Sequence, residues 1–190
     1  MNSFRLAIAL LLSVTVISVA NAQRRNDPLT DAETDQLRNQ AQEPDLRLKL
    51  FVDFARKRLD AIDKVRSDPK TTDRGKATHD GLQDFLDVYD EMNDNVDSFA
   101  DQKVDFRKAL KSIIDADVEF AAKLRALQTS SNSSPAEFKV YEFLLQSALE
   151  TVDSSVKDHR ELLAEQEDAA KHKKRPNQKQ QGSYSKGGGL

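Results

Sequence analysis

Apolar residues recur at steps of three and four along most of the chain between residues 44 and 167, the spacing that places one face of an α-helix against a core. The first such segment begins at Pro44, which suits the first helical turn because its missing N–H would have no intrahelical partner there. Its apolar positions are Leu48, Phe51, Val52, Ala55, Leu59, Ile62 and Val65. The pattern predicts a helix over 44–67. It is expected to end at Asp68, because Pro69 follows.

The longest segment with helical spacing runs from about 72 to 129. Its register passes from Leu82 through Phe99 and Phe106 to Leu127, and no Gly or Pro interrupts it between Gly81 and Thr129. This predicts one unbroken central helix, about 87 Å long at a rise of 1.5 Å per residue. The expected fold is all-α, an extended antiparallel coiled-coil assembly around that helix. The alternative is a compact up-down four-helix bundle with a turn near residues 98–103.

Capping signals delimit two further helices. Thr30 and Glu33 form the S/T-x-x-E capping box and predict a short helix over 31–41. Ser134, Pro135 and Glu137 mark the start of a last helix, whose apolar positions continue to about residue 167. The helical domain is therefore expected at 44–167, after a linker and short helix at 23–43. Residues 168–190 have no apolar periodicity and are expected to form a disordered basic tail.

The first 22 residues have the three-part layout of a secretory signal peptide. A weakly basic start precedes an apolar run, and small residues end it at Ala20-Asn21-Ala22. The run is shorter than the roughly 20 residues that cross a bilayer, so we expect cleavage before Gln23 and no transmembrane segment in the mature protein. The predicted location is secreted or periplasmic.

Composition and charge narrow the chemistry. The chain has no cysteine, which excludes disulfides, thiolate metal sites and covalent c-type haem attachment. The formal net charge of −3 becomes −4 without Arg5 of the leader, and −10 for residues 23–170 once the six basic residues of 171–190 are also set aside. An acidic body argues against nucleic acid as a partner, because phosphates require a basic face.

Residues 79–102 contain eight carboxylates and no Lys or Arg. In the register of Leu82 all of them lie opposite the apolar seam, as on a solvated helix face. A straight helix face cannot surround a calcium ion, but a single sign of charge suits a basic partner, since like charges at i,i+4 destabilise a helix. The candidate partner-binding residues of this stretch are Asp84, Asp87, Asp90, Glu91, Asp94, Asp97 and Asp101.

Two basic segments of the chain itself could face these acids. One is the group Arg56, Lys57, Arg58 and Lys64 of the preceding helix. The other is the tail, whose candidate binding residues are Lys171, Lys173, Lys174 and Arg175. If the last helix runs antiparallel to the central helix, its end near 167 returns to about residue 96 and brings the tail to the acidic stretch.

A few polar residues interrupt the apolar seams. Lys103 and Asp117 are expected to set the helix register or to lie in a partly wet interface. In the antiparallel register His159 faces Lys103 or Val104, more than two turns from Met92. No haem pair of Met and His is therefore expected, and no cofactor or metal is predicted.

The segment PLTDAETDQLRNQ resembles the L-T-x-x-Q element of the periplasmic stress chaperones of the Spy and CpxP type, which are exported, cysteine-poor and helical. The likeness covers about a dozen residues; Glu33 stands where that element has Gln, and no second copy occurs. We therefore assign no family.

The sequence supports two functional hypotheses. The first is an exported, non-enzymatic structural or interaction protein of the cell envelope or extracellular space. It would bind a protein or an envelope polymer through charged helix faces and the basic tail, and a homodimer would cover the apolar surface of the long helix. The alternative is a small periplasmic helical bundle that is chaperone-like or binds a ligand.

Overall fold

The computed structural model describes residues 27–130 and 134–173, which form an all-α fold without strands. Five helices follow one another along this part of the chain: α1 (Asp31–Asn39), α2 (Pro44–Ser67), α3 (Arg74–Asp101), α4 (Arg107–Ser130) and α5 (Pro135–Lys173). None of these helices is long and apolar enough to cross a membrane. The predicted leader, residues 1–22, lies outside the described residues.

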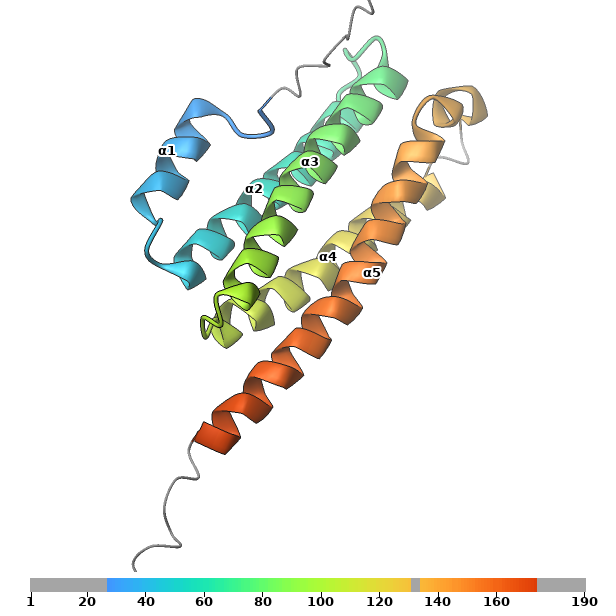
Figure 1. The fold of residues 1–190 in the computed structure, drawn as a ribbon. Coiled ribbons are helices and arrows are strands. Elements are labelled where there is room, and N and C mark those ends of the chain that lie inside the picture. Colours follow the sequence, from blue (N-terminus) through green and yellow to red (C-terminus); the bar gives the residue numbers. More distant parts are fainter. Residues whose placement is uncertain (1–26, 131–133, 174–190) are drawn as a thin grey trace, which may run out of the picture.

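Each of the four longer helices packs against two of the other three, and α1 packs on α2 (Figure 1). The packed pairs are α2 with α3, α3 with α5, α5 with α4, and α4 with α2. Asn93 contacts Ser155 and Val104 contacts Gln166, with the same offset of 62 residues, so α3 and α5 run parallel. By contrast, Arg125 pairs with Asp153 and Lys111 with Glu167, so α5 is antiparallel to α4.

The apolar faces of the four helices meet in one core. Phe85 and Tyr89 of α3 contact Phe120 of α4, with ring centroids 5.6 and 6.3 Å apart. These three side chains are fully buried, as are Phe51 of α2 and Tyr141 of α5. Aromatic contacts across the core thus join α3 to α4, although these two helices are not packed neighbours. Most residues predicted to form the apolar seams lie in this core, whereas Val65 and Phe99 are half-buried.

The prediction of one unbroken helix over 72–129 is wrong, because α3 ends at Asp101 and α4 begins at Arg107. The N–H of Lys103 donates to the carbonyl of Ala100, and that of Val104 donates to the carbonyl of Phe99. This pair of bonds is the Schellman motif that ends helices, and it requires left-handed backbone at Lys103, where φ is 56°. Glycine usually occupies that position, so its absence left the helix end unmarked in the sequence.

Contacts from distant helices hold this turn. The side chain of Gln166 on α5 accepts from the N–H of Phe106 and donates to the carbonyl of Val104. Asp45 at the start of α2 accepts from the N–H of Ala109 and so caps α4. The apolar register continues across the turn because the rings of Phe99 and Phe106 pack 6.0 Å apart on its two sides.

The expectation of a homodimer was based on the uncovered apolar surface of one long helix. That reason falls away, since α3 and α4 bury their apolar faces within one chain.

The other boundaries are close to the prediction. The capping box of Thr30 and Glu33 is present, and α1 ends at Asn39 rather than at 41. Helix α2 has the predicted bounds, with Pro44 at its first position. Helix α5 continues to Lys173, six residues beyond the predicted end near 167, so the start of the predicted tail is helical. In Figure 1 this last part of α5 projects past the turn between α3 and α4.

Candidate functional site

The acidic residues predicted as a binding surface lie along the outer side of α3. We call Asp84, Asp87, Asp90, Glu91, Asp94, Asp97 and Asp101 the α3 acidic face. None of the seven is buried, while Phe85, Tyr89 and Met92 on the opposite side of the helix are fully buried. The side chain of Gln83 donates to Asp87 at 2.7 Å. The predicted orientation of these carboxylates is confirmed.

Six carboxylates of the α3 acidic face have no ion-pair partner among the described residues. Among the described residues no ion pair joins Asp84, Asp87, Glu91, Asp94, Asp97 or Asp101 to a cation. On the other helices several carboxylates are paired with Arg or Lys, among them Glu33, Asp35, Asp53, Asp60, Glu119, Glu137, Asp153 and Glu167, while others, such as Asp115, Glu161 and Glu165, are not paired within the described part of the chain. The predicted concentration of one sign of charge therefore persists in the folded chain.

The basic residues of α2 mostly face elsewhere. Arg56 forms a bidentate ion pair with Glu119 of α4 at 3.0–3.1 Å, and the Lys57 ammonium lies over the ring of Phe54. Arg58 binds Glu33 of α1 at 2.6 and 2.9 Å. Its charge also stabilises the ionised carboxyl of Asp84 on the α3 acidic face. Partial burial raises the pKa of the Asp84 carboxyl. The charge of Arg58 lowers this pKa, while the neighbouring carboxylates of Asp87 and Asp80 raise it further.

A groove runs between α3 and α5 beside the acidic face. One part of it, about 360 Å³, has apolar side chains of Val96, Ala100 and Leu162 and carboxylates of Asp97, Asp158, Glu161 and Glu165. A second part, about 340 Å³, shares Ala100, Leu162 and Glu165 and continues along Val104 to Ala169 and Ala170. We call the two parts together the α3–α5 groove. It was not predicted, because the parallel pairing of α3 and α5 depends on the turn at 102–106.

A buried polar network lies at the inner end of this groove. Asp117 of α4 is fully buried and accepts from the Tyr89 hydroxyl at 2.7 Å, while Nδ1 of His159 lies 2.8 Å from its other oxygen. Burial raises the pKa of the Tyr89 hydroxyl, and the charge and hydrogen bond of Asp117 raise it further. The expectation that His159 faces Lys103 or Val104 is therefore wrong: its partner is Asp117, the other predicted polar interruption.

Ser155, His159 and Asp117 are the residue types of a hydrolytic triad, but their geometry differs from one. Nucleophilic catalysis requires a hydrogen bond between the serine hydroxyl and the histidine. Here Ser155 Oγ accepts from Asn93 at 3.1 Å, and no bond joins it to His159. The network joins α3, α4 and α5 through buried hydrogen bonds.

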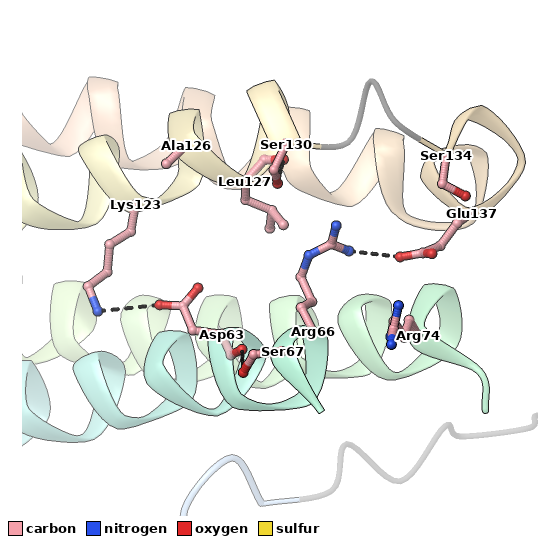
Figure 2. Close-up of a pocket in the computed structure, with 10 residues that line it drawn as sticks. All are labelled: Asp63, Arg66, Ser67, Arg74, Lys123, Ala126, Leu127, Ser130, Ser134 and Glu137. Atoms are coloured by element: carbon pink, nitrogen blue, oxygen red, sulfur yellow. Dashed lines mark hydrogen bonds and ion pairs between the residues drawn. The ribbon is translucent and has the colours of Figure 1, made fainter. Parts of the chain in front are cut away.

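A third hollow lies at the opposite end of the helices, where α2 and α4 end and α3 and α5 begin. Figure 2 shows its charged side chains turned toward one another. Arg66 donates to Glu137 at 2.9 Å and to the Tyr141 hydroxyl at 3.0 Å, while Lys123 pairs with Asp60 and Asp63. These two cations are thus engaged by the protein itself, and the contacts tie α2 to α4 and α5.

The basic candidates lie at or beyond the end of α5. Lys171 is exposed and pairs with Asp168 at 2.9 Å, one turn before it. Lys173 is the last residue of the helix, and its side chain, Lys174 and Arg175 lie outside the described residues. The structure thus places Lys171 on the projecting part of α5, away from the α3 acidic face.

Within the described residues no group of three or more His, Asp or Glu side chains is arranged to hold a metal ion. The described chain is an all-α protein with a single-signed acidic face beside an open groove. Comparison with protein-family models, with curated proteins and with solved structures found no match for it.

Proposed function

We propose that this chain is an exported, non-enzymatic helical protein that binds a cationic protein or polymer through the α3 acidic face. The observation that carries the proposal is the concentration of one sign of charge on one helix. Between Asp84 and Asp101, six carboxylates of α3 have no ion-pair partner among the described residues, and no Lys or Arg occurs in that stretch. Charges that the fold leaves uncompensated are available to a partner.

The single sign of charge on this face suits it to the recognition of a cationic partner. Like charges at i,i+3 and i,i+4 repel, so the free helix face carries a cost of a few tenths of a kcal/mol per pair that a cationic partner would remove. A field of one sign also speeds association with an oppositely charged surface and suppresses wrong partners. Such binding falls as salt rises, since screening acts within about 10 Å at 0.1 M ionic strength.

The shape of the described cavities favours surface binding over an enclosed ligand. Both parts of the α3–α5 groove are open to solvent, and the core beneath is filled by buried aromatic and aliphatic side chains. Chaperone-like binding of apolar segments would require a continuous apolar surface. The large apolar side chains most exposed, Leu46, Val118, Val140 and Phe143, are spread over α2, α4 and α5.

A charge-neutralised variant tests the proposal. Asp87→Asn, Asp94→Asn and Asp101→Asn together remove three charges from the face without changing side-chain size. With immobilised polylysine as the probe, we expect binding at low salt to weaken about tenfold, which corresponds to roughly 1.4 kcal/mol over three exposed contacts.

The matched control removes the same net charge elsewhere, through Asp35→Asn, Asp115→Asn and Asp153→Asn on α1, α4 and α5, where all three residues are exposed. It should retain most of the affinity. Equal weakening in both variants would mean that polylysine senses net charge alone, and the α3 acidic face would lose its assigned function.

A further inference from the structure

The α3–α5 groove has the chemistry of a site for a basic peptide. Its floor is apolar at Val96, Ala100 and Leu162, and its rim carries Asp97, Glu161 and Glu165. Within the described residues no ion pair compensates these three carboxylates. A peptide with separated cations and uncharged residues between them could place its charges on the rim and its backbone over the floor.

The groove leads to the place where the chain leaves α5. Because α5 is parallel to α3 with an offset of 62 residues, Asp101 lies level with residue 163, and α5 continues for ten residues beyond that level. The groove follows this projecting part as far as Ala170, three residues before the helix ends. Residues 174–190 therefore start close to one mouth of the groove.

The length of this segment is sufficient to fill the groove. Returning from residue 173 to the level of Ser155 requires about 27 Å at 1.5 Å per residue of α5. The 17 residues of 174–190 reach up to about 56 Å when extended. A segment tethered this closely has an effective concentration on the order of millimolar, so even weak contacts can fill the site.

The charges of the segment complement the carboxylates of the groove, which outnumber its one lysine, Lys103. Residues 174–190 contain Lys174, Arg175, Lys179 and Lys186, with no Asp or Glu, and Tyr184 is their aromatic residue. Lys174 and Arg175 are adjacent, and Lys179 and Lys186 follow at intervals of four and seven residues with uncharged residues between them. This spacing suits carboxylates distributed along a groove wall.

We propose that residues 174–190 dock in the α3–α5 groove and compete there with the cationic partner. The inference rests on the proposed function, because Asp97 and the adjoining end of the α3 acidic face would serve both ligands. The tail then acts as a built-in competitor that a partner of higher charge density displaces, and rising salt releases it.

A single spin label tests the docking. The chain has no cysteine, so Ser185→Cys provides one attachment point for a nitroxide on the whole exported protein. At low salt we expect the label to broaden the backbone amide signals of residues 96–101 and 158–166. The broadening should disappear at about 0.5 M salt, where screening reaches only a few ångströms.

Two variants with the same label separate the groove from net charge. Asp97→Asn, Glu161→Gln and Glu165→Gln should abolish the broadening, whereas the triple control at Asp35, Asp115 and Asp153 should retain it. Broadening that is absent at low salt, or spread over helices away from the groove, would overturn the inference.

Polylysine binding distinguishes this outcome from failure of the proposed function. If the tail docks, Lys174→Gln, Arg175→Gln, Lys179→Gln and Lys186→Gln in the full chain should strengthen polylysine binding several-fold by removing the competitor. If the label shows no docking and polylysine still requires Asp87, Asp94 and Asp101, the inference fails while the proposed function stands. If docking occurs but those three residues do not matter for polylysine, the proposed function fails instead.

Discussion

Replacing His159 by leucine removes one of the two hydrogen-bond partners of a carboxylate that solvent does not reach. The side chain of Asp117 is 0% exposed and that of His159 is 5% exposed, and the remaining partner is the Tyr89 hydroxyl at 2.7 Å. Removing one partner of a buried acceptor costs about 1–3 kcal/mol, and more when the acceptor is charged, because the acceptor stays in the core without compensation.

We expect His159→Leu to lower the free energy of unfolding by about 2–3 kcal/mol, within that range, since Tyr89 still bonds Asp117 and leucine adds apolar burial. Tyr89→Phe removes a hydrogen bond to a charged acceptor and should cost about 1.5–3 kcal/mol. Against a total stability of about 5–15 kcal/mol, each change is large. The melting temperature should fall by about 2–4 °C for each kcal/mol.

Urea unfolding followed by far-UV circular dichroism measures these free energies. The control is His79→Leu, because the side chain of His79 is 44% exposed and its loss should change stability by less than about 0.5 kcal/mol. Asp117→Asn in the same background gives a further check: without the buried charge, His159→Leu should cost less than in the native chain. The reasoning is refuted if His159→Leu and Tyr89→Phe both behave like the His79 control.

Three further predictions concern α1, the turn and the leader. Burial acts to raise the pKa of the Glu33 carboxyl, but hydrogen bonds from Arg58 and Thr30 and the charge of Arg58 outweigh it and lower the pKa to about 2 from 4.5. The roughly 3 kcal/mol that this shift represents is present above pH 4.5 and lost as the pH falls toward 2, so Glu33→Gln should remove that part of the acid dependence in urea titrations. Lys103→Gly should raise stability by about 0.5–1 kcal/mol, because glycine adopts the left-handed φ without a Cβ clash, whereas Lys103→Ala should not; equal effects of both would refute the backbone argument. If the leader directs export as predicted, mass spectrometry of the mature protein should find Gln23 at the N-terminus, and an intact residue 1 would disprove cleavage.

Local sequence was sufficient to predict most of the secondary structure and the core. The capping box at Thr30, the proline at position 44 and apolar spacing gave the starts of α1 and α2 and the buried residues, because such signals act within a few residues of chain. The outward orientation of the α3 acidic face follows from the same periodicity. These features depend on which side of a helix a residue occupies, and the order of residues along the chain determines that side.

Only the tertiary structure decided how the helices meet. The break at 102–106 is held by Gln166 of α5 and Asp45 of α2, more than fifty residues away in each case, and by a lysine in the position that glycine usually marks. That break makes α3 and α5 parallel, which creates the groove between them and brings His159 to Asp117. Contacts between distant residues leave no local signal when polar and apolar side chains keep the same helical spacing on both sides of a turn.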